Sequence, residues 1–208
     1  MTRDVRIGVL DYGSGNLHSV CQALDAADAD VVLSADADAL GRCDGLVVPG
    51  VGAFAACMAG LRQARGDALI GDWLAQGRPL LGICVGHQIL FERGVEHELD
   101  TPGLGILPGV VERLTSARLP HMGWNLVEPA ADSRMFVGLA GRRFYFVHSY
   151  GVHQPLDGAA WAEHEGDRFV AAVERGTLWS TQFHPEKSGQ AGARLLANWL
   201  ELAGEARA

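Results

Sequence analysis

The stretch around Cys84 has the residue types and the spacing of a nucleophile elbow. Gly82 and Gly86 stand two residues to either side of Cys84, and the apolar run at 80–83 is typical of a buried strand. A nucleophile on a sharp turn from a strand into a helix needs such small neighbours. The helix start then offers N–H groups that stabilise a thiolate and, later, an oxyanion. The pattern predicts a reactive cysteine, with a small buried hydrophobic residue as the alternative.

A histidine and a carboxylate suited to activating this thiol lie far downstream, in His184-Pro185-Glu186. We expect Pro185 to keep the segment extended and to prevent a helix from starting, so that His184 and Glu186 share one side. A carboxylate beside an imidazole fixes its tautomer and raises its basicity, as a thiol-activating base requires. A surface turn is the alternative. The order Cys, His, Glu differs from that of α/β-hydrolases and disfavours a lipase-like enzyme.

The first half of the chain alternates short apolar runs with stretches of helical spacing. Strands are predicted at 5–10, 31–33, 45–48 and 80–83, and helices from residue 17, over 55–76 with a break around Gly66, and directly after Gly86. This alternation is typical of a parallel α/β sheet, whose ligands bind at the carboxyl ends of the strands. The loops at 12–16, 49–54 and 84–88 are therefore expected to meet at one edge.

The second half of the chain has a different pattern. A loop is predicted at 103–109, followed by short β-like runs at 110–112, 123–127, 143–147, 159–162, 169–173 and 177–183. Close runs separated by Gly or Asp turns indicate antiparallel hairpins. A closing helix is predicted at 189–203. Because no stretch has the composition of a linker, we expect one domain over 1–208.

Two glycine-rich turns follow the first and third predicted strands. Gly13-x-Gly15 resembles the start of a dinucleotide fingerprint, but His18 replaces its third glycine, which disfavours nucleotide binding. The second turn, 49–54, is a place where main-chain N–H groups can face a ligand. A tight turn with glycines for steric reasons is the alternative.

Composition narrows the classes of function. The chain has 208 residues, 48% of them hydrophobic, and a formal net charge of -8, which argues against a nucleic-acid partner. No apolar run reaches the length of a membrane span and no signal peptide is recognisable, so a cytoplasmic location is expected. The four cysteines form no CxxC pair and no zinc-ligand spacing with histidines, so we expect neither disulfides nor a metal.

The two motifs together resemble the class I (triad-type) glutamine amidotransferases. The resemblance rests on GICVGHQ at 82–88 and on HPE at 184–186. It implies a flavodoxin-like α/β core with a mostly parallel sheet, helices on both faces and additional antiparallel strands in the second half. It also implies a catalytic triad of Cys84, His184 and Glu186 that hydrolyses glutamine to glutamate and ammonia without a cofactor.

Further stretches resemble one group within this family, the glutaminase subunits of imidazole glycerol phosphate synthase. They are DYGSGNLHSV at 11–20, PGVGAF at 49–54, HMGWN at 121–125, FVHSY at 146–150 and HPEKS at 184–188. This resemblance implies a role in histidine biosynthesis, in a heterodimer with a (β/α)8-barrel cyclase subunit that receives the ammonia through a channel. It also implies allosteric activation by that partner. His87 departs from the pattern, since Met is usual there, and we expect it to pack beside the elbow helix.

The resemblance also assigns further residues. The oxyanion is expected to meet the N–H of Val85 and an N–H of the Gly50-Val51-Gly52 loop, whose donor is predicted to be misaligned in the isolated chain. Gln88, Ser149 and Tyr150 are expected to hold the amino-acid end of glutamine. The residues expected to face the cyclase are Tyr12, Asn16, Met122, Trp124 and Lys187.

Three other readings of the sequence are open. His87 is more typical of the anthranilate and aminodeoxychorismate glutaminases, so the chain could serve another synthase. An amidotransferase-like binding protein without catalysis is disfavoured because Cys84, His184 and Glu186 are all present. A thiol hydrolase or protease of the same fold is disfavoured by Gln88 and by the Pro-Gly-Val-Gly loop.

Overall fold

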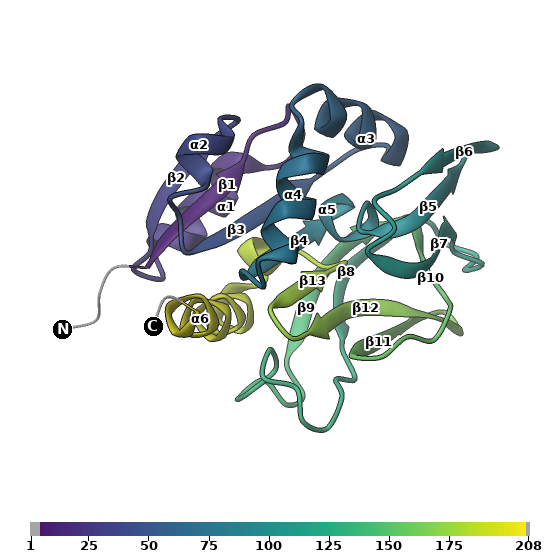
Figure 1. Ribbon diagram of the computed structural model, residues 1–208. Helices are drawn as coiled ribbons and strands as arrows, with labels where there is room; N and C mark the ends of the chain where they lie inside the picture. The colour runs from purple at the N-terminus through teal and green to yellow at the C-terminus, as the bar shows by residue number, and fades with distance from the viewer. Residues whose placement is uncertain (1–4, 207–208) are drawn as a thin grey trace.

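The computed structural model describes residues 5–206, and its largest layer is a seven-stranded sheet in the order β11-β12-β13-β4-β3-β1-β2 (Figure 1). The neighbours from β13 to β2 pair in parallel, whereas β11, β12 and β13 pair antiparallel at one side. The predicted mostly parallel sheet is confirmed. The strands of this sheet are β1 (Arg6–Leu10), β2 (Asp30–Ser34), β3 (Gly45–Gly50), β4 (Leu80–Cys84), β11 (Ala159–His164), β12 (Asp167–Arg175) and β13 (Leu178–Thr181).

Helices cover both faces of this sheet, as predicted. Successive residues of a strand point to opposite faces. Gly8 of β1 packs against Leu40 of α2 on one face, while Gly45 of β3, which pairs with Ile7, packs against Trp199 of α6 on the other. The helices are α1 (Leu17–Asp25), α2 (Ala37–Leu40), α3 (Phe54–Gln63), α4 (Gly66–Ala75), α5 (Val85–Gln88), the 3₁₀ helix η1 (Pro185–Lys187) and α6 (Gly189–Glu205). None of the helices within 5–206 has the length and apolarity to cross a membrane.

Two smaller sheets were not foreseen as separate layers. One has the order β10-β7-β5-β6 and the other pairs β8 with β9. Strand runs were predicted for β7, β8 and β9, but β5, β6 and β10 were missed. The strands of the smaller sheets are β5 (Phe91–Glu96), β6 (Leu99–Pro102), β7 (Leu107–Arg113), β8 (His121–Leu126), β9 (Arg143–His148) and β10 (Tyr150–Val152).

The helix after the elbow is shorter than its spacing indicated. Helix α5 is one turn long, because the carbonyl oxygens of Ile89 and Leu90 accept N–H groups from the segment that leads into β7. Leu104 N–H bonds the Ile89 oxygen at 2.9 Å, and Leu107 N–H bonds the Leu90 oxygen at 2.9 Å. The apolar residues Val85, Ile89 and Leu90 are buried as expected, but by tertiary contacts rather than by a longer helix.

Pro185 also behaves differently from the prediction. It begins the 3₁₀ helix η1 instead of preventing a helix from starting. Proline suits the first helical position, because its fixed φ fits and its missing N–H is not needed there. His184 before it is extended, with φ −102° and ψ 97°, and Glu186 lies within the helical turn.

Two further element boundaries can be compared with the sequence predictions. The predicted break in the helix at 55–76 lies just before Gly66, where Arg65 adopts a left-handed conformation with φ 56°. Strand β7 begins at Leu107, inside the predicted loop at 103–109. The predicted hairpins of β11 with β12 and of β12 with β13 are confirmed.

The loops at the carboxyl ends of β1, β3 and β4 meet at one edge of the sheet, as the topology required. The Tyr12 hydroxyl donates to the carbonyl oxygen of Pro49 at 2.6 Å. A Cβ on Gly50 would lie 2.7 Å from the backbone nitrogen of Gly86, so the second loop packs directly on the elbow. This edge holds the candidate site.

Candidate active site

Cys84 lies at the end of β4 in a backbone conformation that L-residues rarely adopt, with φ 56° and ψ −112°. The flanking glycines are required by close packing. A Cβ on Gly86 would lie 1.8 Å from the carbonyl oxygen of Val48, and a Cβ on Gly82 would lie 2.7 Å from the carbonyl oxygen of Gly86. The predicted sharp turn from strand to helix is confirmed. It places Cys84 at the start of α5 and in the wall of a pocket.

His184 and Glu186 form a buried pair beside this pocket. The Nδ1 atom of His184 lies 2.8 Å from a carboxylate oxygen of Glu186, and both side chains are almost fully buried. Burial lowers the pKa of His184, but Cys84 and Glu186 outweigh it and raise the pKa to about 9. The imidazolium form is thus favoured next to these two groups, as a thiolate–imidazolium pair requires. Nε2 of His184 has no hydrogen-bond partner within the described residues.

The pocket has a volume of about 240 Å³, suited to a molecule smaller than a drug. Among the described residues that line it, Glu96 is the one carboxylate and Lys187 the one ammonium group. Glu96, on β5, also accepts the N–H of Phe54 at 2.8 Å. Of the residues predicted for the site, those that line this one pocket are Val51, Gly52, Cys84, Val85, Gln88, Ser149, Tyr150, His184 and Lys187.

The Gly50-Val51-Gly52 loop is held by side chains from the first loop and from α3. Val51 donates its N–H to Ser14 Oγ at 3.1 Å, and the Ser14 hydroxyl donates to the Val51 carbonyl at 2.8 Å. The Cys57 thiol lies 3.3 Å from the same carbonyl. The Val51 N–H is therefore occupied by Ser14. The misalignment of an oxyanion donor in the isolated chain stays a prediction.

A model of the family described as glutamine amidotransferase class-I matches residues 8–202. The chain belongs to the class-I glutamine amidotransferase family. The fold agrees with this membership. A crystal structure described as a glutamine amidotransferase aligns with a TM-score of 0.75 and 24% identity, covering 95% of this chain and 98% of the other. PurLQS from Thermotoga maritima aligns with a TM-score of 0.74 and 19% identity, covering 96% and 99%.

Similar sequences narrow the group within the amidotransferases. A protein of Nocardia farcinica named imidazole glycerol phosphate synthase subunit HisH is 60% identical, covering 97% of this chain and 99% of its own length. A protein of Streptomyces coelicolor with the same name is 55% identical, covering 96% of this chain and 94% of its own length.

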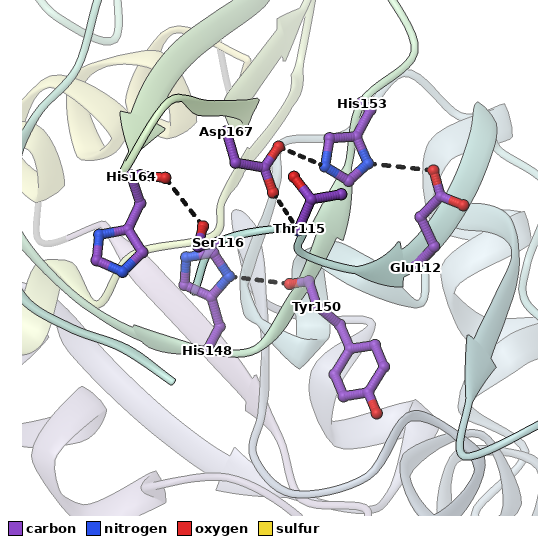
Figure 2. A network of polar contacts seen from close by, with 8 residues as sticks. All are labelled: Glu112, Thr115, Ser116, His148, Tyr150, His153, His164 and Asp167. Atoms are coloured by element: carbon purple, nitrogen blue, oxygen red, sulfur yellow. Dashed lines mark hydrogen bonds and ion pairs between the residues drawn. The ribbon is translucent and has the colours of Figure 1, made fainter. Parts of the chain in front are cut away.

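Two neutral histidines, His148 and His121, support the part of the pocket formed by Tyr150 in this amidotransferase. His148 donates from Nδ1 to the carbonyl oxygen of Tyr150 at 2.9 Å, as Figure 2 shows. Its Nε2 must then accept, and it lies 3.2 Å from Nδ1 of His121. Burial lowers the pKa of His148 to about 3 and that of His121 to about 4. The two histidines therefore hold the Tyr150 carbonyl in place as uncharged rings.

A second hydrogen-bond network holds the segment that follows Tyr150 (Figure 2). His153 lies between two carboxylates, 3.1 Å from Glu112 on β7 and 3.0 Å from the buried Asp167 on β12. Asp167 also accepts the N–H of Thr115. These contacts tie the four-stranded sheet, which carries Tyr150, to the seven-stranded sheet.

His87 lies within the elbow helix α5 rather than beside it, and its ring packs against residues of β13 and β5. It is fully buried, its Nδ1 lies 2.8 Å from Ser180 Oγ, and its ring meets Phe91 edge-on at 5.0 Å. Burial lowers its pKa to about 3, so the ring is neutral. His87 does not line the pocket, and its contact with Ser180 links α5 to β13.

The residues predicted to face a partner fall into two classes. Met122 and Trp124 on β8 are 63% and 51% exposed, so Trp124 is not a core aromatic. Lys187 is exposed and Asn16 half-buried. Tyr12 differs, because it is only 5% exposed and holds Pro49 through its hydroxyl, and its side chain therefore offers almost no surface to a partner.

Sequence reasoning missed three residues of this site. Glu96 lies at the end of a strand that was itself missed. His148 lay within a motif that was quoted for other residues, and only its bond to Tyr150 reveals its place. Gln182 had a usable signal, since it stands two residues before His184 and lies in the run predicted as a strand at 177–183, where alternate residues share a side.

Proposed function

We propose that the chain is a glutaminase in which Cys84, His184 and Glu186 act as a catalytic triad. The observation that carries the proposal is the His184–Glu186 pair beside a strained cysteine elbow, where Cys84 and Glu186 raise the pKa of His184 to about 9. An imidazole held in this state stabilises the thiolate and keeps a proton ready for the leaving group.

The reaction proceeds in two stages. The Cys84 thiolate attacks the side-chain amide carbon of glutamine, and His184 gives its proton to the departing ammonia, leaving a γ-glutamyl thioester. His184 then removes a proton from water, which attacks the thioester and releases glutamate. Glu186 keeps Nδ1 of His184 protonated and supports the positive charge throughout.

Charge complementarity in the pocket suits a zwitterionic amino acid. Glu96 and the polar groups of Gln88 are the partners for the ammonium group, and Lys187 and the backbone N–H groups near Ser149 and Tyr150 are those for the carboxylate. This arrangement retains Gln88, Ser149 and Tyr150 as predicted and adds Glu96.

Activation would act on the oxyanion loop. The Val85 N–H at the start of α5 is one donor, and the Val51 N–H becomes the second once it leaves Ser14. One such donor is worth about 2.7–4 kcal/mol in comparable enzymes. The resting enzyme would therefore be slow until a partner rotates the Val51 peptide.

The proposed partner is the (β/α)8-barrel cyclase subunit of imidazole glycerol phosphate synthase, joined as a heterodimer in histidine biosynthesis. Relatives named imidazole glycerol phosphate synthase subunit HisH, at 55–60% identity over nearly the whole chain, support it. Met122 and Trp124 form an exposed apolar patch on β8, with Asn16 and Lys187 as further candidate contacts. The names of these relatives favour this synthase over another one, although His87 departs from the usual Met. A cytoplasmic location remains a prediction.

The test measures ammonia release from glutamine by the purified chain, alone and with a barrel cyclase carrying its phosphoribosyl substrate. We expect strong activation by that pair and loss of at least about 10³-fold in Cys84→Ala. The matched control is Cys21→Ala, which removes a half-buried free cysteine of α1. Activation only by a chorismate-using synthase would refute the proposed partner. Activity that survives in Cys84→Ala would refute the triad.

A further inference from the structure

Gln182 is a fully buried polar side chain that contacts the nucleophile and Gln88, two residues that line the pocket. It follows β13 and precedes His184 by two residues, and its exposed fraction is 0%. Its backbone N–H donates to Ala171 at 2.8 Å, which fixes the segment on β12. Its side chain contacts two groups, the Cys84 sulfur at 3.9 Å and the side-chain amide of Gln88 at 2.9 Å.

The orientation of the Gln182 amide follows from its neighbours. The carbonyl oxygen of Tyr150 can only accept, so the group of Gln88 that lies 3.0 Å from it is the NH₂ group. The second hydrogen of that NH₂ group points to Gln182, which must present its oxygen. The NH₂ group of Gln182 therefore faces Cys84 Sγ.

We propose that Gln182 is a further catalytic residue, whose side-chain N–H donates to Cys84 Sγ and stabilises the thiolate. The inference rests on the proposed glutaminase function. Gln182 transfers no proton, since an amide N–H is not acidic enough; it supplies a fixed dipole. Hydrogen bonds to a charged acceptor are stronger than neutral ones, so the contact gains strength when the thiol ionises.

The same bonds connect substrate binding to the nucleophile. Gln88 lines the pocket, holds the Tyr150 carbonyl and orients Gln182 with one NH₂ group. The hydrogen bonds from Tyr150 through Gln88 and Gln182 to Cys84 therefore have one direction of donation, because the Tyr150 carbonyl can only accept. A side chain that only filled space would need no such order.

The test compares Gln182→Met with the wild-type chain. Methionine keeps an unbranched side chain of similar length but has no N–H donor. The first readout is the rate of Cys84 alkylation by iodoacetamide as a function of pH, with the modified cysteine identified by mass spectrometry. We expect the midpoint of the profile to move up by about one pH unit, and kcat for glutamine in the cyclase complex to fall about tenfold with KM little changed.

Two further variants separate a donor role from a packing role. Gln182→Leu has a different shape but also lacks the donor, so a donor role predicts the same shift as in Gln182→Met, and it decides the matter if the first variant does not fold. Gln190→Met, at the exposed start of α6, is the control and should leave the profile unchanged. Alkylation profiles of folded Gln182 variants that superimpose on that of the wild type would overturn the proposal. Because alkylation needs neither glutamine nor a partner, this result is distinct from a failure of the glutaminase proposal.

Discussion

The two sides of the pocket differ in how firmly they are held. On one side, the elbow and the strand that leads to His184 are joined by buried contacts, His87 with Ser180 and Gln88 with Gln182. On the other side, Val51 is 42% exposed and its peptide is held by the Ser14 hydroxyl and the Cys57 thiol. The nucleophile and the base are preorganised, whereas the oxyanion donor rests in contacts that are easily exchanged. Control of turnover is therefore expected at the loop rather than at the triad.

The largest expected effect comes from the fixed side. Glu186→Gln should lower kcat about 10³–10⁴-fold, because the His184 ring loses the carboxylate that sets its tautomer and supports its charge. Glutamine hydrolysis in the cyclase complex measures this loss. Glu201→Gln on the exposed side of α6 is the control. A loss of less than about tenfold would remove Glu186 from the triad.

Stability provides the next test of the fixed side. Gly86→Ala should lower the free energy of unfolding by at least about 3 kcal/mol, because its Cβ would lie 1.8 Å from the Val48 carbonyl oxygen. Gly71→Ala, inside α4, should raise it by about 0.5–1 kcal/mol, since its Cβ meets nothing within 4 Å. Urea unfolding of both variants measures the difference. Equal effects would contradict the tight elbow.

The buried His87 predicts a pH dependence of stability. Its pKa is lowered from 6.5 to about 3, so the stability from the neutral ring is present above pH 6.5 and is lost as pH falls toward 3. When pH falls from 7 to 5, the free energy of unfolding of the double variant His87→Met/Ser180→Ala should decrease by about 2 kcal/mol less than that of the wild type. Urea unfolding at the two pH values measures this, with His18→Met on the exposed face of α1 as control. Identical pH dependences of the double variant and the wild type would show that His87 is not buried in solution.

The smallest effect is expected at the loop. Ser14→Ala should raise the glutaminase rate of the isolated chain about 2–10-fold, because the hydroxyl that occupies the Val51 N–H is worth about one hydrogen bond. The rate in the cyclase complex should change little, so the activation ratio falls. Ser19→Ala in α1 is the control. A lower basal rate in Ser14→Ala would mean that the serine supports the active loop.

Much of the fold was predictable because its signals are local. Apolar runs of strand length alternate with helical spacing as far as Cys84, and hairpin turns mark β11, β12 and β13. Strands β5 and β6 were missed because neither has an apolar run or a regular apolar alternation, and they are strands only by pairing with β7 and with each other. The length of α5 was wrong for a related reason, since distant N–H groups capture the carbonyls of Ile89 and Leu90.

By itself, the sequence determined the chemistry that is available: a cysteine between two glycines, a His-Pro-Glu segment and a glycine-rich loop, each required by local backbone geometry. Only the tertiary structure decided which groups meet. It brought Glu96 to the pocket and Gln182 to the Cys84 sulfur, buried Tyr12 and paired the Val51 N–H with Ser14. These contacts join residues far apart in the chain, so their energies depend on packing between elements and leave no periodic trace in the sequence.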